Sequence, residues 1–343
     1  MPRTLKETNE TLVIELPVSG PPPVPQPSLR PAGTLPKPPR RLAAGTIPPV
    51  SRSKRRAPKE LGIGSRIGPW LIERELGRGG MGRVYAVAHS GFGKRAALKV
   101  CHTSMIDRDL AANTFLREAR IVNLIDHPAV PDVFATGTFE NRPYLAMERL
   151  QGETLRQLWS SGALSQESAL EILVELCGVL QAAHDAGVVH RDLTLDNVFV
   201  LDKPGAGGCR IKLLDWGFAR VLAEDDPLRG HIAGTMTYVA PEAIVGREVS
   251  PASDVYALGV LAYILLLGQA PFAADELVEL AAMHLHQEPP APQRLRPAIR
   301  PELEQLLLAM LAKEPSWRPV LAEIQRELSA RPRRRRRWLQ LVP

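Results

Sequence analysis

Residues 188–200 (VVHRDLTLDNVFV) combine an apolar frame with side chains that could do acid–base or metal chemistry. The apolar residues at both ends of the stretch predict burial, yet polar side chains lie between them: His190, Arg191, Asp192, Asp196 and Asn197. Burying so many polar groups costs free energy unless each of them is paired or used. We therefore interpret the stretch as a loop anchored in a core, with Asp192 and Asn197 as its chemical groups.

A second candidate is the glycine-rich stretch LGRGGMGRVYAV (76–87). Glycine lets backbone N–H groups approach phosphates closely, because it has no Cβ. A dinucleotide-binding fold would need a helix after the last glycine, and a Walker loop would need Gly-Lys-Ser/Thr there. The sequence instead has Arg83 and the strand-like run VYAV. The pattern favours a hairpin whose tip lies over phosphates, with a plain glycine-rich turn as the alternative.

Lys99 and Glu118 could supply a fixed positive charge to the same site. Lys99 lies in the apolar, strand-like run RAALKV, and Glu118 lies further along on a stretch with helical character. An ion pair between strand and helix would hold the ammonium group in place for a phosphate. Taken by itself, a lysine in such a run is more often a surface lysine.

Three further stretches complete an ordered set of motifs: HRDLTLDN (190–197), IKLLDWGFA (211–219) with Asp215, and GTMTYVAPE (234–242). With the glycine loop and the Lys–Glu pair, this set resembles the eukaryotic-like (Hanks-type) protein kinase family. The Gly-Gly-Met-Gly form of the loop is most similar to that of the bacterial Ser/Thr kinases. The resemblance covers residues 67–328 and continues through DVYALGV (254–260) to KEPSWRP (313–319), whose Arg318 is expected to pair with Glu242.

The resemblance implies a two-lobed α+β fold. Its small, β-rich N-lobe with one long helix would span residues 66–150, and its larger, mostly helical C-lobe residues 151–330. It also implies an ATP- and Mg²⁺-dependent kinase that phosphorylates protein Ser/Thr hydroxyls. Asp192 would be the catalytic base, and Asn197 and Asp215 would bind Mg²⁺. Lys99, held by Glu118, would hold the α- and β-phosphates.

By the same resemblance, the nucleotide would lie between the lobes, under the glycine loop. Apolar side chains would enclose the adenine, Met147 would be the gatekeeper, and backbone groups of Glu148 and Leu150 would bind the edge of the base. The expected nucleotide contacts are Leu76, Gly77, Gly79, Gly80, Gly82, Val84, Ala97, Lys99, Met147, Glu148, Leu150 and Phe199.

Thr194 departs from the family pattern, because most Ser/Thr kinases carry a lysine at this position, near the transferred phosphate. Losing that cation removes one source of transition-state stabilisation. Lys99, Asp192 and the metal ligands are retained, so we expect an active enzyme with a reduced rate.

The segment between residues 218 and 234 is a second departure, since it contains no Ser, Thr or Tyr. The arginine before the catalytic aspartate usually means a pocket for a phosphorylated residue of this segment. Here the segment carries the acidic run Glu224-Asp225-Asp226 instead. We predict that these carboxylates, or none, occupy the Arg191 pocket. Thr235, which follows the segment, is expected to contact Asp192.

Two other classes of function are weighed against a Ser/Thr protein kinase. A nucleotide-binding pseudokinase scaffold is disfavoured because all five expected catalytic residues are present. A kinase of small molecules is disfavoured by the Ala-Pro-Glu motif and the complete substrate loop. Specificity for Ser/Thr over Tyr follows from Gly234-Thr235 and from the absence of Ala-Ala-Arg after HRDL.

The elements that must position these residues follow from the hydrophobic periodicity. Short β-rich runs dominate from residue 67 to 150, interrupted by one helical stretch at 110–125. Helical periods follow at 165–187, 251–267, 273–286 and 300–312. Ser165 is a suitable N-cap and Gly187 a suitable stop for the first of these helices. A cleft is expected where the two lobes meet.

Basic charge is concentrated at the two ends of this 343-residue chain. Residues 1–60 carry 11 Lys/Arg against 4 Asp/Glu, and residues 331–343 carry 6 Arg and no acid. The net charge is +6, so residues 61–330 carry a net charge of −7. A mildly acidic body argues against a nucleic-acid-binding surface.

The head, residues 1–65, is rich in proline and is expected to be disordered. It is interpreted as a linker, with a proline-recognising partner as the alternative. The Arg-rich tail, residues 331–343, could touch an anionic membrane, although a solvated end is the default. We find neither a signal peptide nor a transmembrane segment, and the three dispersed cysteines predict no disulfide framework, so we expect a cytoplasmic protein.

Overall fold

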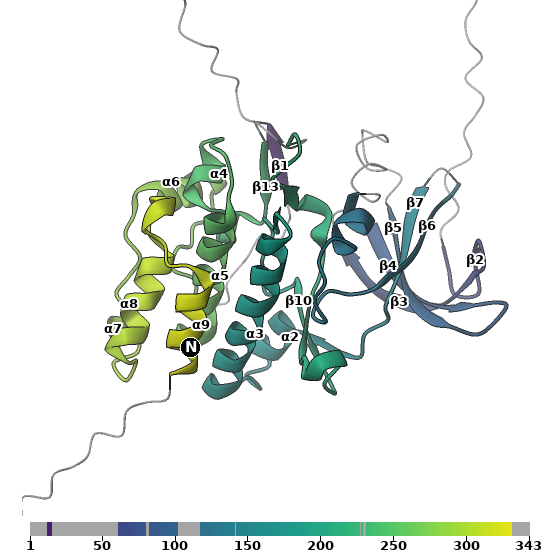
Figure 1. The fold of residues 1–343 in the computed structure, drawn as a ribbon, viewed down its shortest axis with the longest axis horizontal. Coiled ribbons are helices and arrows are strands. Elements are labelled where there is room, and N and C mark those ends of the chain that lie inside the picture. Colours follow the sequence, from purple (N-terminus) through teal and green to yellow (C-terminus); the bar gives the residue numbers. More distant parts are fainter. Residues whose placement is uncertain are drawn as a thin grey trace, which may run out of the picture.

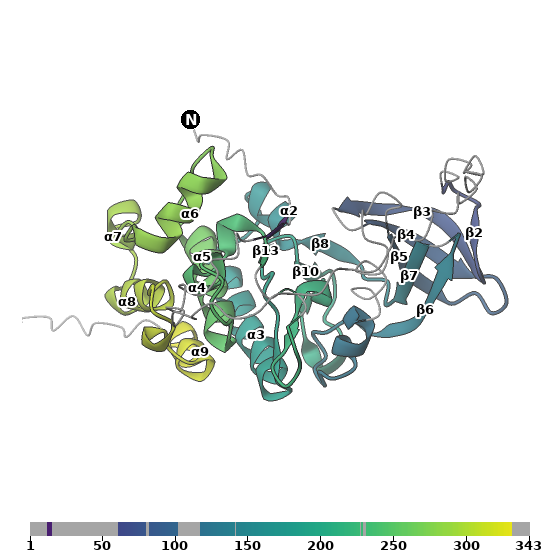
Figure 2. The same ribbon diagram turned by 90° about the horizontal axis from the view of Figure 1, so that it is seen from above.

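Two lobes of unequal size lie side by side in the computed structural model of the chain (Figure 1). The structure describes residues 12–15, 61–79, 82–101, 117–140, 142–226, 228 and 231–330. A β-sheet makes up most of the smaller lobe and helices make up most of the larger one, so the expected two-lobed α+β fold is confirmed. Figure 2 shows the same division from above, with the sheet at one end and the C-terminal helices at the other.

The small lobe contains the strands β2 (Arg66–Ile67), β3 (Trp70–Gly79), β4 (Gly82–His89), β5 (Arg95–Cys101), β6 (Val133–Phe139) and β7 (Arg142–Met147). They form one antiparallel sheet of six strands in the order β2-β3-β4-β5-β7-β6. Ile67, Trp70 and Leu98 belong to its small apolar core. β3 and β4 form the expected glycine-rich hairpin, in which Gly79 pairs with Gly82.

Residues 117–122 are helical and are held by both lobes. Ala119 shares an apolar cluster with Cys101 and Leu145 of the small lobe. Ile121 and Val122, in contrast, belong to the core of the large lobe. The rest of the long helix predicted here falls within residues 102–116, outside the described part of the chain. Glu118 is thus carried by a helical turn that packs on both lobes.

Two long helices, α3 (Gln166–Asp185) and α5 (Pro251–Leu267), form the centre of the large lobe. α3 begins and ends close to the predicted residues, because the Ser165 hydroxyl accepts a hydrogen bond from the Ser168 N–H and Gly187 follows with a φ of 73°. α5 is buried along almost its whole length, which explains why its sequence is apolar on all sides.

Shorter helices surround this pair: α2 (Leu155–Ser160), α4 (Pro241–Ile244), α6 (Leu277–His286), α7 (Pro292–Leu295), α8 (Pro301–Met310) and α9 (Leu321–Ser329). α9 packs on α3, and α8 packs on α5. α6 begins a few residues later than predicted, since Phe272 lies in an irregular segment and packs in an apolar cluster with Ile244 and Leu280. Within the described ranges, no helix combines the length and hydrophobicity needed to cross a bilayer.

Short elements of the large lobe carry the chemistry-bearing loops. β9 (Val188–Val189) pairs with β12 (Arg220–Val221), and β10 (Val198–Leu201) lies between β8 (Gly152–Thr154) and β11 (Ile211–Leu213). The loop 190–197 therefore connects β9 to β10, and Asp215 follows β11. The remaining short elements are η1 (Ala206–Gly208), η2 (Trp216–Phe218), η3 (Met236–Tyr238), η4 (Pro315–Trp317) and the strand β13 (His231–Gly234).

Residues of the head also form a strand, β1 (Leu12–Glu15), which pairs antiparallel with β13 (Figure 1). The expectation of a disordered head over residues 1–65 is wrong at this point. The run Leu-Val-Ile-Glu contains β-branched residues and no proline, so it can join the edge of a sheet. The other residues of the head up to 60, and the tail 331–343, lie outside the described part of the chain.

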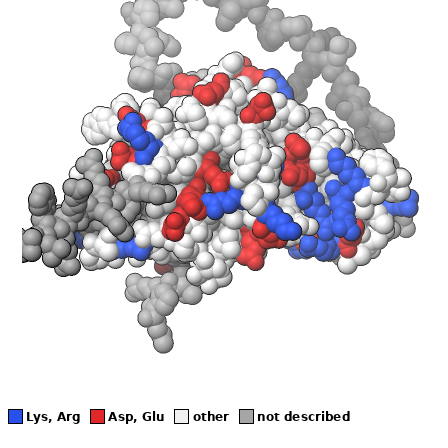
Figure 3. Space-filling model, turned by 60° about the horizontal axis from the view of Figure 1, so that its bottom comes forward, with Lys and Arg blue, Asp and Glu red and all other residues white. Residues whose placement is uncertain are grey.

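Charged side chains are interleaved on the face of the molecule shown in Figure 3. Lys and Arg gather toward the small-lobe end of this face, while Asp and Glu are spread across its middle. Residues 61–330 as a whole carry a net charge of −7, which is counted from the sequence. That the body does not bind nucleic acid stays a prediction.

Candidate active site

Lys99 lies at the centre of a buried ion-pair cluster. It is on β5, next to Val84 of β4 and Leu145 of β7. Its Nζ donates to Oδ1 of Asp215 at 2.8 Å and to the two oxygens of Glu118 at 2.9 and 3.2 Å. Burial alone would lower the pKa of Lys99, but the carboxylates of Asp215 and Glu118 raise it above its ordinary value. The predicted Lys99–Glu118 pair is thus present, and Lys99 is not a surface lysine.

Asp215 points toward Lys99 because of an uncommon backbone conformation. It follows β11 with φ 60° and ψ 70°, the left-handed region that non-glycine residues rarely adopt. The adjacent Leu214 N–H donates to the carbonyl oxygen of Asn197 at 2.7 Å, which joins this turn to the loop 190–197. Burial would raise the pKa of Asp215, but Lys99 holds it below its ordinary value. Asp215 is therefore a carboxylate.

Trp216 fills the space beside this turn. Its side chain is fully buried, its indole N–H donates to the Leu213 carbonyl at 3.0 Å, and its ring meets that of His190 edge-on at 4.5 Å. His190 in turn contacts the Leu214 carbonyl oxygen through Nε2 at 3.0 Å. Trp216 thus fills this space as a large buried side chain, as expected from the sequence. His190 supports the loop through its contacts, as expected.

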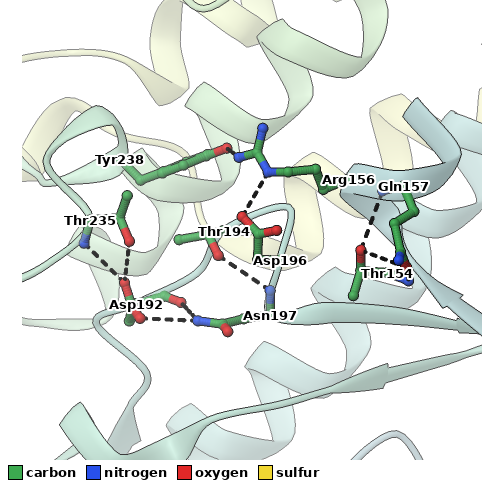
Figure 4. A network of polar contacts seen from close by, with 9 residues as sticks. All are labelled: Thr154, Arg156, Gln157, Asp192, Thr194, Asp196, Asn197, Thr235 and Tyr238. Carbon is green, nitrogen blue, oxygen red and sulfur yellow. Dashed lines mark hydrogen bonds and ion pairs between the residues drawn. The ribbon is translucent and has the colours of Figure 1, made fainter. Parts of the chain in front are cut away.

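Asp192 is held from two sides (Figure 4). Thr235 donates its backbone N–H and its hydroxyl to Oδ1 of Asp192, at 3.0 and 3.1 Å, so the expected contact is confirmed. Asn197 donates from Nδ2 to Oδ2 of Asp192 at 3.0 Å and to its carbonyl oxygen at 2.8 Å. Burial and the charge of Asp215 raise the pKa of Asp192, against the opposing effects of His190 and Thr235. A raised pKa makes this carboxylate a stronger base.

Asn197 and Asp215 together fit a divalent cation. Both hydrogen bonds from Nδ2 of Asn197 go to Asp192. The amide oxygen Oδ1 of Asn197 therefore points away from Asp192. Asp215 uses Oδ1 for Lys99 and keeps a second carboxylate oxygen. One amide oxygen and one carboxylate oxygen, completed by phosphate oxygens, form the kind of oxygen set that Mg²⁺ accepts in nucleotide sites.

Asp254, at the start of α5, orients the loop 190–197 and was missed in the sequence. It is fully buried, and it accepts hydrogen bonds from the N–H groups of His190 and Arg191, at 2.8 and 2.9 Å. His184 contacts the same carboxylate at 2.9 Å. Burial would raise the pKa of Asp254, but His184 and the loop hold it below its ordinary value. The available signal was a lone carboxylate at the start of an apolar helix, which requires partners when buried.

Thr194 supports the turn of the loop (Figure 4). It is buried, and its hydroxyl accepts a hydrogen bond from the Asn197 N–H at 3.2 Å. The neighbouring Asp196 accepts from Nε of Arg156 at 2.7 Å, and Nη2 of Arg156 donates to the Tyr238 hydroxyl at 3.4 Å. Thr194, which stands where the resemblance led us to expect lysine, therefore holds the backbone of the loop.

Carboxylates occupy the Arg191 pocket in the segment between Asp215 and Glu242, called the activation segment below. Both guanidinium Nη atoms of Arg191 donate to Asp226, one of them at 3.0 Å. Burial would raise the pKa of Asp226, but Arg191 holds it below its ordinary value. The prediction that the acidic run 224–226 fills this pocket is confirmed, and Asp226 is the residue that does so.

The same acidic run also reaches the helical turn that carries Glu118. Glu224 forms an ion pair with Arg120. On the same turn, Arg117 donates from Nε to the Ala219 carbonyl oxygen at 3.3 Å. The activation segment is thereby joined to the element that positions Lys99.

The glycines of the hairpin differ in whether the fold leaves room for a side chain. A Cβ at Gly82 would lie 2.2 Å from the Val100 carbonyl oxygen, so the sheet itself requires glycine there. A Cβ at Gly77 or Gly79 would meet no atom within 4 Å, and this open space suits a phosphate that approaches the backbone. Gly80, expected to belong to the same set, lies outside the described residues.

The apolar residues expected around the adenine come from strands of both lobes. Ala97 of β5 pairs with Met147 of β7, and Val84 lies on the adjacent β4. Phe199 lies on β10 of the large lobe and is partly exposed. Leu76 of β3 is an exposed apolar residue at the hairpin, consistent with a role outside the core.

Glu148 and Leu150 belong to the connection between the lobes. The N–H of Glu148 donates to the Asp132 carbonyl at 2.8 Å, so its carbonyl oxygen is the backbone group that can serve a ligand. Its side chain accepts from Nζ of Lys212 at 2.6 Å. Lys212 is buried and donates to the Val130 carbonyl at 3.4 Å as well. This pair was missed; the signal was a charged residue inside the apolar run IKLLD.

The expected pair between Arg318 and Glu242 is present at the end of the activation segment. Two hydrogen bonds of 2.7 and 2.8 Å join the guanidinium to the carboxylate. The Ser253 hydroxyl donates to the same carboxylate at 2.7 Å. Both charged side chains are buried, so the pair fixes α4 against α5 and η4.

Comparison with known proteins agrees with this arrangement. Residues 70–328 match the family model described as the protein kinase domain. The chain is 40% identical over 258 residues to the serine/threonine-protein kinase Pkn1 of Myxococcus xanthus, covering 75% of this chain and 37% of that protein. It is 35% identical over 278 residues to pkn3 of the same organism (78% and 51%) and 34% identical over 263 residues to PknJ of Mycobacterium tuberculosis (76% and 44%). The chain thus spans between about a third and a half of the length of these relatives.

Proposed function

Since this chain belongs to the eukaryotic-like (Hanks-type) bacterial serine/threonine protein kinase family, we propose that it transfers the γ-phosphoryl group of ATP to serine and threonine hydroxyls of proteins. The observation that supports this most is the convergence of two clusters at the junction of the lobes. One is the buried Lys99–Glu118–Asp215 cluster, and the other is the Asp192–Asn197–Thr235 network. The Leu214–Asn197 hydrogen bond joins them.

The roles we propose follow from the charges of these groups. Lys99, fixed by Glu118, would hold the α- and β-phosphates. Asp192 would orient the acceptor hydroxyl and take its proton as the bond from oxygen to phosphorus forms. Members of this family use ATP with a divalent cation; we propose Mg²⁺, held by Asn197 and Asp215, which would neutralise phosphate charge.

For the nucleotide we propose the contacts that the sequence suggested. The glycine loop would cover the phosphates, and Val84, Ala97 and Phe199 would enclose the adenine. The carbonyl of Glu148 and the backbone of Leu150 would bind its edge. We propose residues 66–330 as the kinase domain, close to the family match over 70–328.

Phosphate transfer to a generic basic protein, with labelled ATP and Mg²⁺, tests the proposal. Asp192→Asn should abolish transfer while nucleotide binding persists, because Asn cannot accept the proton. Asp202→Asn is the matched control: it makes the same chemical change at an exposed position and should leave the rate unchanged. Nucleotide binding by the unmodified chain without any transfer would support the pseudokinase scaffold instead.

Three expectations for the surroundings of this enzyme stay predictions. They are a proline-recognising partner for the head, contact of the tail with an anionic membrane, and a cytoplasmic location. The first two concern segments that lie almost wholly outside the described residues.

A further inference from the structure

Arg156 bridges the two segments that meet at Asp192 (Figure 4). Its Nε donates to Oδ2 of Asp196, in the loop 190–197, at 2.7 Å. Its Nη2 donates to the hydroxyl of Tyr238, in the activation segment, at 3.4 Å. One guanidinium group of α2 thus lies between the loop that carries the proposed base and the segment that holds this base.

We propose that Arg156 helps to select the acceptor. By pairing with Asp196 it disfavours peptides that carry a basic residue within about three positions of the phosphorylated serine or threonine. The inference rests on the proposed kinase activity and adds a class of acceptor to it. A generic basic protein still tests that activity, because it also offers hydroxyls without a neighbouring basic residue.

Asp196 carries the charge that the loop presents to an acceptor. Three residues of the loop 190–197 are accessible, namely Arg191, Asp196 and Asn197. The side chain of Arg191 is only 7% exposed, and Asn197 is neutral. The side chain of Asp196, in contrast, is 43% exposed. A peptide that reaches the base therefore meets this carboxylate.

The path of the loop keeps Asp196 near the acceptor hydroxyl. Asn197, the next residue, donates from Nδ2 to the carbonyl oxygen and to Oδ2 of Asp192, so the loop folds back on itself. Since consecutive Cα atoms are about 3.8 Å apart, Asp196 lies within roughly 10 Å of Asp192. An extended peptide covers about 10 Å in three residues. Side chains close to the phosphorylated residue can thus reach the carboxylate.

The backbone of Arg156 keeps its side chain in this place. α2 begins directly after its N-cap, Thr154, and the N–H of Arg156 donates to the carbonyl oxygen of Leu195 at 3.1 Å. The start of the helix is thereby attached to the residue just before Asp196. Hydrogen bonds between a guanidinium and a carboxylate are stronger than neutral ones. A basic residue of an acceptor must displace an anchored arginine to pair with Asp196, whereas a neutral residue need not.

Two synthetic peptides of equal length test the proposal with the full chain, ATP and Mg²⁺. Each has one central serine, flanked by arginine in the first peptide and by glutamine in the second. The unmodified chain should have the higher kcat/KM for the glutamine peptide. Arg156→Ala exposes the carboxylate and should raise the ratio of kcat/KM, arginine peptide over glutamine peptide, about tenfold. A general loss of activity cancels in this ratio.

Two further variants show whether the change in this ratio comes from Asp196. Adding Asp196→Asn to Arg156→Ala should return the ratio to that of the unmodified chain, because the exposed charge is gone. Arg210→Ala is the matched control, since it breaks a comparable ion pair, with Glu171 of α3, and should leave the ratio unchanged. The proposal is overturned by a rise below about threefold in Arg156→Ala, by an equal rise in Arg210→Ala, or by a rise that persists without the Asp196 carboxylate. An unmodified chain that prefers the arginine peptide overturns it as well.

Peptide binding keeps this inference separate from the proposed function. Peptides with alanine in place of the serine accept no phosphate, and fluorescence anisotropy gives their Kd. Arg156→Ala should lower the Kd of the arginine peptide relative to that of the glutamine peptide about tenfold.

The possible failures are distinguishable. A chain that shows this change in binding but phosphorylates neither serine peptide overturns the proposed function alone. A chain that phosphorylates the glutamine peptide, but whose preference is the same with and without Arg156, overturns the present inference alone. A chain without transfer and without a change in binding overturns both.

Discussion

Replacing Asp226 by alanine is expected to lower the activity strongly by releasing the activation segment from Arg191. The two side chains are only 13% and 7% exposed, respectively. Breaking a buried ion pair by removing one partner costs about 3–5 kcal/mol. The pair lines a cavity of about 190 Å³ at the surface, so water can reach the remaining guanidinium, and we take about 2–3 kcal/mol. If this free energy holds the segment beside Asp192, kcat/KM falls about 30- to 140-fold, at about 1.4 kcal/mol per tenfold.

Initial rates at saturating ATP measure this effect, and thermal unfolding shows whether the rest of the lobe stays folded. Asp225→Ala is the matched control, since it removes the neighbouring, exposed carboxylate and should leave both quantities unchanged. Asp226→Glu keeps the charge and should recover most of the activity. An Asp226→Ala protein with the kcat/KM of the unmodified chain would show that the pair does not hold the active arrangement.

The pH dependence of the pair has a definite sign. Because the pKa of Asp226 is lowered in the folded protein, its stabilisation is complete above the ordinary aspartate pKa. It is lost only as the pH falls through the lower, folded-state value. The effect of Asp226→Ala should therefore be constant around neutral pH, and a loss of the effect near neutral pH would implicate a different group.

Three other substitutions test separate parts of the structure. Thr194→Lys should change kcat by up to about tenfold and should change the Kd for ATP less. An unchanged kcat would show that Thr194 does not influence the rate. Arg318→Met leaves the carboxylate of Glu242 buried without its counter-charge, so urea unfolding should show a loss of about 3–5 kcal/mol, against less than about 0.5 kcal/mol for the exposed control Arg326→Met. Glu118→Gln removes a negative charge that faces the buried ammonium group of Lys99 and should raise the KM for ATP several-fold; an unchanged KM would mean that Asp215 alone fixes that group.

The residues that gather at the candidate site could be predicted from the sequence because the family pattern places a few residue types in a fixed order. The pairs Lys99–Glu118 and Arg318–Glu242 are both present, although the second joins residues 76 positions apart. The family pattern carries such long-range information, whereas local propensity does not. Helix α3 was equally predictable, since its apolar stripe, its N-cap and its glycine stop agree.

Other contacts could not be predicted, because each depends on a partner that leaves no local trace. A single carboxylate at the start of the apolar helix α5 must be paired. The residues around Asp254 in the sequence do not indicate that its partners are the N–H groups of residues 63 and 64 positions earlier. The same holds for Lys212, whose partner Glu148 lies 64 positions away. β1 was overlooked for a related reason: four residues among prolines resemble a linker until the free edge of β13 is known.

The helical turn at residues 117–122 makes the position of Lys99, our proposed phosphate-binding residue, depend on how the two lobes pack. Ala119 belongs to the small-lobe cluster and Ile121 to the large-lobe core, while Glu118 lies between them and holds Lys99. A cavity made by Ile121→Ala would therefore shift this turn and weaken the Lys99–Glu118 ion pair. Affinity for ATP would then fall at temperatures where both lobes are still folded. If Lys99 holds the phosphates as proposed, its ammonium group would be in position only when the small-lobe cluster and the large-lobe core both pack on this turn.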